Sequence, residues 1–68
     1  MLSSKNLFPF LIFFLMDCIA EYDYSATHAD ELSLKKGDII KSVIFFETGW
    51  KKGWLNGKEG VFPDKFVK

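Results

Sequence analysis

The sequence predicts an all-β protein built as a small barrel of five short strands. Runs of β-branched and aromatic residues alternate with turn signals, and no segment of useful length has helical periodicity. A chain of 68 residues also leaves no room for two layers of long sheets. It forms one domain at most, with a core of modest size, so a deep catalytic cleft is not expected.

The first half of the chain supplies one short strand, a long polar stretch and one long strand. Cys18-Ile19-Ala20 is the first expected strand, and the polar stretch runs from Asp23 to Asp38. Within it Leu32-Ser33-Leu34 alternates with period two, as an extended segment with one buried face does. Lys36-Gly37-Asp38 is a turn signal, and the composition of Ile39 to Phe46 predicts a strand.

The second half predicts a tight hairpin. Asn56-Gly57 separates the strand-like runs Trp50 to Leu55 and Lys58 to Phe62. A type I′ turn needs positive φ at both central residues, and Asn-Gly meets that need best, so this dipeptide predicts a two-residue hairpin turn.

After the hairpin, Pro63 ends the strand because proline has no N–H to donate to a neighbouring strand. Asp64-Lys65-Phe66 is expected to form a single 3-10 turn, followed by a last short strand at Val67.

Charge and cysteine content exclude several classes of function. The net charge is zero and all nine basic residues are Lys, so nucleic acid is not an expected partner. Cys18 is the only cysteine, so no intramolecular disulfide forms, and a reducing, cytoplasmic location is expected with Cys18 as a buried apolar residue.

No cofactor, metal ion or catalytic activity is expected. His28 is the only histidine and has no Cys or carboxylate partners at metal-ligand spacing. The chain also has no glycine-rich phosphate loop, and its His and Cys lie in segments of different kinds, so the sequence predicts that the protein is not an enzyme.

Residues 1–16 differ in composition from the rest. Leu7 to Met16 is apolar apart from Pro9, with Lys5 before it and Asp17 after it, and it is too short to cross a bilayer. We expect residues 1–16 to be an extension outside the fold, with Met16 as a true or alternative start. A signal peptide or membrane anchor, and an element packed on the domain, are the alternatives.

The order and spacing of several motifs from Cys18 to Lys68 resemble those of an SH3 domain, which places the domain at residues 17–68. Within that family the chain is most similar to the SH3 domains of the Cbl-interacting endocytic adaptors. The motifs are Ala20-Glu21-Tyr22-Asp23-Tyr24, Asp30-Glu31-Leu32-Ser33-Leu34, Lys36-Gly37-Asp38-Ile39-Ile40, Gly49-Trp50, Leu55 to Pro63 and Phe66-Val67.

Alternation and the family pattern together predict the core residues and two glycines at close backbone contacts or sharp bends. Gly53 and Gly60 are expected where the backbone comes close to a neighbour or bends sharply. The expected core residues are Ala20, Leu32, Leu34, Ile40, Leu55, Phe62 and Val67.

Aromatic residues in separated segments predict a binding surface. A domain this small cannot bury so many large rings, so several should lie outside and form grooves for an extended ligand. The resemblance implies a proline-rich peptide of the Pro-x-x-Pro or Pro-x-x-x-Pro-Arg type, held by a non-catalytic module of an adaptor or scaffold. One proline pocket is then flanked by Tyr22 and Phe66, and a second is lined by Tyr24, Trp50, Pro63 and Phe66.

Acidic residues are expected to receive the basic residue of such a ligand. The resemblance assigns this role to Asp30 and Glu31, at the tip of the long loop. Between Asp17 and Glu31 there are five acidic residues and no Lys, so this half should carry a negative field that orients a basic peptide.

The sequence departs from the family pattern at several places. Lys65 replaces the usual Asn, Lys51 replaces a second Trp, and Trp54 occupies a position that tends to be polar. Because Ile44-Phe45-Phe46 fills a flank that is usually charged, we expect one or both Phe rings to pack against Trp54 across adjacent strands.

Phe66 suggests a second possible ligand. Most SH3 domains have Tyr at this position, and some that have Phe bind ubiquitin through the same surface. Ubiquitin is therefore an alternative ligand that rests on the resemblance alone.

Overall fold

The computed structural model describes residues 16–68 as four antiparallel strands and one short 3-10 turn. The expected N-terminal extension lies outside the described residues, except for Met16, which begins β1. No helix among residues 16–68 is long and apolar enough to cross a membrane. The elements are β1 (Met16–Ile19), β2 (Ile39–Glu47), β3 (Trp50–Leu55), β4 (Lys58–Pro63) and η1 (Asp64–Phe66).

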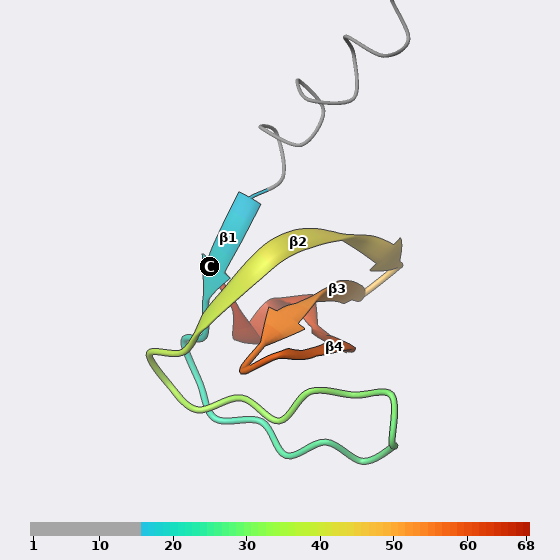
Figure 1. Cartoon of the computed structure of the whole chain (residues 1–68), viewed down its shortest axis with the longest axis horizontal. Helices are drawn as coiled ribbons and strands as arrows, with labels where there is room; N and C mark the ends of the chain where they lie inside the picture. The colour runs from blue at the N-terminus through green and yellow to red at the C-terminus, as the bar shows by residue number, and fades with distance from the viewer. Residues whose placement is uncertain (1–15) are drawn as a thin grey trace, which may run out of the picture.

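The strands pair in chain order, β1-β2-β3-β4, and the end of the chain returns to β1 (Figure 1). Val67 forms an isolated antiparallel bridge with Ala20. The Lys68 N–H donates to the Ile19 carbonyl at 2.9 Å, and the Ile19 N–H donates to the Lys68 carbonyl at 3.2 Å. This pairing adds the end of the chain to the free edge of β1. The expected all-β fold with a 3-10 turn is confirmed, with its fifth strand reduced to one bridge.

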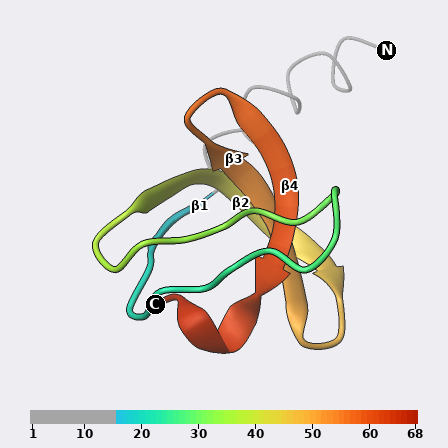
Figure 2. The same ribbon diagram turned by 90° about the horizontal axis from the view of Figure 1, so that it is seen from below.

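A long loop, residues 21–38, connects β1 to β2, and its two arms run across β4 (Figure 2). The arms are joined by reciprocal backbone hydrogen bonds of 2.9 and 2.8 Å between Tyr24 and Leu34. The returning arm is tied to β4, because Leu32 N–H donates to the Val61 carbonyl at 2.8 Å and Val61 N–H donates to the Asp30 carbonyl at 2.9 Å. These bonds fix the loop tip beside the hairpin.

The turn and glycine predictions are confirmed. Asn56 and Gly57 have φ angles of 52° and 80°, as a type I′ turn requires. A Cβ placed on Gly53 would lie 2.6 Å from Cγ2 of Ile40, and one on Gly60 would lie 2.9 Å from the Asp30 carbonyl oxygen. Both positions therefore exclude a side chain so that β2 and the long loop can approach the hairpin.

The core lies between the sheet and the long loop. Five of the seven predicted core residues are buried, while Leu55 and Val67 are half-buried and pack against the cluster. Cys18 is buried as expected, and Val43 and Val61 are buried although the sequence did not single them out. The buried apolar residues are Cys18, Ala20, Leu32, Leu34, Ile40, Val43, Val61 and Phe62.

Candidate functional site

Four aromatic rings from three separate segments lie in a row on the surface. The ring centroids of Tyr22 and Phe66 are 6.1 Å apart, those of Phe66 and Tyr24 are 5.2 Å apart, and those of Tyr24 and Trp50 are 6.4 Å apart. All three contacts are edge-to-face, the arrangement that aromatic quadrupoles favour. Tyr22 is exposed and the other three rings are half-buried, so each keeps a surface open to solvent.

The strand ends and η1 position these rings. Trp50 begins β3 directly after the turn at Gly49, whose φ is 86°, and it pairs with Pro63 at the end of β4. The Asp64 N–H donates to the Gly49 carbonyl at 3.0 Å, which fixes the start of η1 beside that turn. The structure thus brings Pro63 and Phe66 to the same end of the hairpin as Trp50.

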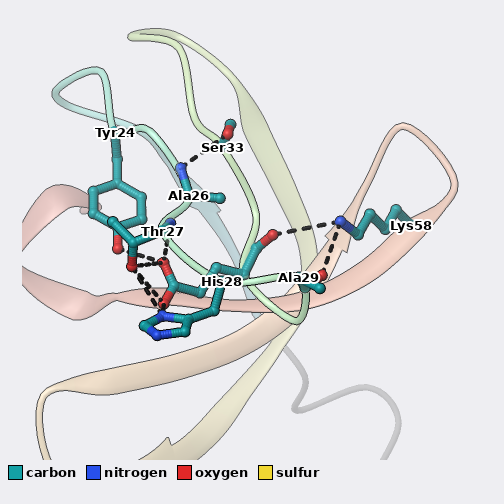
Figure 3. A network of polar contacts seen from close by, with 8 residues as sticks. Tyr24, Ala26, Thr27, His28, Ala29, Ser33 and Lys58 are labelled. Carbon is teal, nitrogen blue, oxygen red and sulfur yellow. Dashed lines mark hydrogen bonds and ion pairs between the residues drawn. The ribbon is translucent and has the colours of Figure 1, made fainter.

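Glu31 corrects one expectation, because it is not an exposed residue of the loop tip. Its side chain is buried, and its carboxylate accepts hydrogen bonds from the Tyr24 hydroxyl at 2.6 Å and from the Thr27 N–H at 2.9 Å. Nδ1 of His28 lies 2.8 Å from the second carboxylate oxygen (Figure 3). The cause is the parallel bridge between Glu31 and Val61, which draws this part of the loop against β4.

These contacts alter two pKa values. The Thr27 N–H and then the Tyr24 hydroxyl stabilise the ionised carboxylate and lower the pKa of Glu31 to about 2. The same bond to Glu31 raises the pKa of the Tyr24 phenol. Glu31 therefore carries a negative charge throughout the physiological pH range, in contact with the hydroxyl of Tyr24.

Further hydrogen bonds hold the rest of the loop in place (Figure 3). The Ala26 N–H donates to Oγ of Ser33 at 3.0 Å, joining the two arms. Nζ of Lys58, at the start of β4, donates to the Ala29 carbonyl at 3.3 Å. The acidic end of the loop is therefore fixed relative to the hairpin that carries Trp50.

An acidic hollow of about 200 Å³ adjoins Trp50. Asp30, the other predicted acidic residue, is exposed and lines it together with Glu31. Three further lining residues, Phe46, Glu47 and Val61, were not predicted from the sequence. The available signal was the Thr48-Gly49 turn, which folds the end of β2 back toward Trp50. Among residues 16–68 no three His, Cys, Asp or Glu side chains are grouped as a metal site requires.

The expected packing of Phe45 or Phe46 on Trp54 is wrong. Trp54 pairs with Lys41, whereas Phe45 pairs with Lys51, three residues before Trp54 in β3. Three residues correspond to about 10 Å along a strand, which separates the rings. Phe46 instead has Nζ of Lys52 5.5 Å from its ring centroid.

Known proteins resemble the chain in sequence. The model of the SH3 domain family matches residues 19–64. The mouse CD2-associated protein is 53% identical over 55 residues, which cover 79% of this chain and 9% of that protein. The human SH3 domain-containing kinase-binding protein 1 is 43% identical over 54 residues, or 79% of this chain and 8% of that protein. These matches confirm the predicted resemblance to the Cbl-interacting adaptors.

Solved structures agree. The C-terminal SH3 domain of myosin IB from Entamoeba histolytica superposes with a TM-score of 0.73 at 46% identity, covering 79% of this chain and 90% of that one. The yeast Abp1 SH3 domain gives a TM-score of 0.75 at 34% identity, with 78% and 95% covered. The family model, the relatives and the fold agree that this chain belongs to the SH3 domain family.

Proposed function

We propose that the chain is a non-catalytic interaction module that binds proline-rich peptides containing a basic residue. The observation that carries this proposal is the row of rings from Tyr22 to Trp50, open to solvent and next to an acidic hollow. Rings in a row suit a ligand that is extended before it binds, because a polyproline II segment loses little conformational entropy on docking.

In this proposal the proline residues of the ligand lie between the rings. Tyr22 and Phe66 flank one pocket, and Phe66 with Tyr24, Trp50 and Pro63 lines the next. The spacing of the ring centroids, 5.2 to 6.4 Å, and the exposure of Tyr22 support this use. A shallow groove of this kind is expected to give a dissociation constant on the order of micromolar.

The basic residue of the ligand enters the acidic hollow beside Trp50. Glu31 supplies fixed negative charge there, but its oxygens are already bonded to Tyr24, Thr27 and His28. The exposed carboxylate of Asp30 is therefore the group that the ligand reaches first, and Glu47 adds a third carboxylate to the same hollow.

Structures of relatives support the peptide ligand. The SH3 domain of Entamoeba histolytica myosin IB is also known bound to the EhFP10(GEF) peptide, and the chain that binds it is 46% identical to this one. The chain spans about a tenth of the curated relatives it matches, which are adaptor-type proteins. We accordingly propose a cytoplasmic adaptor or scaffold role, connected with endocytosis.

Titration of the full chain with a Pro-x-x-x-Pro-Arg peptide tests the proposal. Binding should shift the NMR signal of the Trp50 indole, and Trp50→Ala should abolish binding. Trp54→Ala is the matched control, because Trp54 lies in the same strand, is exposed and lies outside the row of rings. A peptide that leaves the Trp50 signal unchanged contradicts the proposal. The same titration with ubiquitin tests the alternative partner.

A further inference from the structure

Phe46 connects the acidic hollow to a second hollow further along the hairpin. The second has a volume of about 320 Å³ and shares Asp30, Phe46 and Val61 with the first. Its other lining residues are Lys52, Glu59 and Gly60. The two hollows are therefore adjacent, one beside Trp50 and the other along the β3–β4 hairpin.

The charges in the second hollow are not balanced by internal contacts. Within residues 16–68 the carboxylates of Asp30 and Glu59 form no side-chain hydrogen bond and no ion pair. The one cation present, Lys52, places Nζ 5.5 Å from the centroid of the Phe46 ring. The chain's own lysine thus marks the face of Phe46 as a place where a cation binds.

We propose that this second hollow is a further subsite of the peptide groove, which takes a second Lys or Arg of the ligand. This inference rests on the proposed function. The first basic residue occupies the hollow beside Trp50, and the second lies over the ring of Phe46 between the carboxylates of Asp30 and Glu59. Lys52 is displaced, because a cation–π contact on the exposed ring of Phe46 is weak and two carboxylates attract the incoming charge.

Continuity and charge complementarity both favour a basic occupant. The second hollow shares three lining residues with the first, which already suits a cation, so one peptide can contact both hollows. The two hollows together are lined by four carboxylates, those of Asp30, Glu31, Glu47 and Glu59, against the single ammonium group of Lys52, so their combined charge favours two ligand cations.

The test compares peptides in pairs on the full chain. One peptide carries Pro-x-x-x-Pro-Arg alone, and a series adds a second Arg one to four residues later, with Gln or norleucine at the same place as references. We expect the best two-Arg peptide to bind about 3- to 10-fold more tightly than its Gln partner, with the gain reduced at high salt.

Three substitutions test whether the gain in affinity from the second Arg arises in the second hollow. Phe46→Ala and Glu59→Gln should each reduce the two-Arg gain, and Glu59→Gln should keep the affinity for the single-Arg peptide, since Glu59 lines only the second hollow. Lys52→Gln should increase the gain by removing the competing cation, an effect that loss of folding does not mimic. Phe45→Ala is the matched control, since Phe45 is the neighbouring exposed Phe of the same strand but lines a different hollow, with Met16 and Val43.

The outcomes separate this inference from the proposed function. If neither peptide binds, both proposals are overturned. If the single-Arg peptide binds but the second Arg gives no gain, or if Phe46→Ala leaves the gain intact, only the second subsite is overturned. Equal gain from norleucine makes the hollow an apolar site and also overturns the inference.

Discussion

Phe62 and Trp50 are two large aromatic residues of the same hairpin, β3–β4, with opposite surroundings. Phe62 is fully buried among Ile40, Leu34 and their neighbours, whereas Trp50 keeps a solvent-facing surface and packs edge-on against Tyr24. Pro63, directly after Phe62 and opposite Trp50, points to the other face, because side chains alternate along a strand. Stability and recognition therefore use neighbouring residues on separate faces, and substitutions should affect one without the other.

The largest loss of stability is expected for Phe62→Ala. Removing a fully buried ring leaves a cavity that the surrounding strands cannot fill, at a cost of about 3–5 kcal/mol in the free energy of unfolding. A loss of that size can unfold a domain this small. Urea denaturation followed by tryptophan fluorescence measures it. Phe45→Ala, at a ring that is 73% exposed, is the control and should stay within about 0.5 kcal/mol of the parent.

Gly53→Ala is expected to be the next most damaging substitution. The new Cβ would lie 2.6 Å from Cγ2 of Ile40 and 3.0 Å from the Lys41 carbonyl oxygen, so β2 must move. Overpacking of this kind costs about 1–3 kcal/mol. The sign of the change in unfolding free energy decides the matter, because Gly→Ala at an unobstructed site stabilises by about 0.4–1 kcal/mol. An unfolding free energy equal to or above that of the parent contradicts the close approach.

Most of this two-faced arrangement could be predicted from the sequence. Asn56-Gly57 indicated the hairpin because its φ requirement is local, and Leu32-Ser33-Leu34 indicated a buried face through its period of two. The convergence of Tyr22, Trp50 and Phe66 was not visible in periodicity, since it depends on contacts between distant segments. The family resemblance supplied it, and the ring distances agree with it.

Alternation failed where the backbone departs from a regular strand. Counting from Ile40 in steps of two would place Ser42 and Ile44 inside, yet Val43 is the buried residue. Ser42 has a φ of 53°, and the pairing register shifts between Lys41 and Ile44, so the strand changes phase at this bulge. A single non-glycine residue in the left-handed region leaves no reliable mark in the sequence.

Glu31 was placed wrongly for a different reason. Charged side chains are rarely buried unless they are paired, and the groups that bond this carboxylate, Tyr24, Thr27 and His28, are identified only by the fold of the loop. The binding face therefore rests on a polar network around the buried carboxylate of Glu31, in contrast to the apolar cluster around Phe62.

The polar network should make stability depend on pH. Folding lowers the pKa of Glu31 from its ordinary 4.5 to about 2, so its contribution is complete above pH 4.5 and is lost as the pH falls toward 2. Glu31→Gln should lower the urea midpoint at neutral pH and flatten its decline over that window. Part of the decline remains, because the Lys41 ammonium and then the Ser42 N–H also lower the pKa of Asp17.

Urea midpoints of Glu31→Gln measured from pH 2 to pH 7 check this prediction. Glu59→Gln is the control, since within residues 16–68 the Glu59 carboxylate forms no hydrogen bond. Its urea midpoint should change with pH as that of the parent does. If the urea midpoint of Glu31→Gln falls with pH as steeply as that of the parent, the network does not hold the carboxylate ionised.

The smallest effect on stability is expected for Lys65→Asn, within about 0.5 kcal/mol, because Lys65 is an exposed residue of η1 next to the rings. Binding should nevertheless improve, since an Asn amide both donates to and accepts from a ligand backbone, whereas an ammonium group only donates. One added hydrogen bond of about 0.5–1.5 kcal/mol corresponds to roughly 2- to 12-fold tighter binding. Fluorescence titration with the Pro-x-x-x-Pro-Arg peptide measures the gain, and Lys65→Gln, whose amide lies one methylene further out, is the matched control. A gain in affinity at unchanged stability supports the separation of the two faces. A change in stability without a gain in affinity contradicts it.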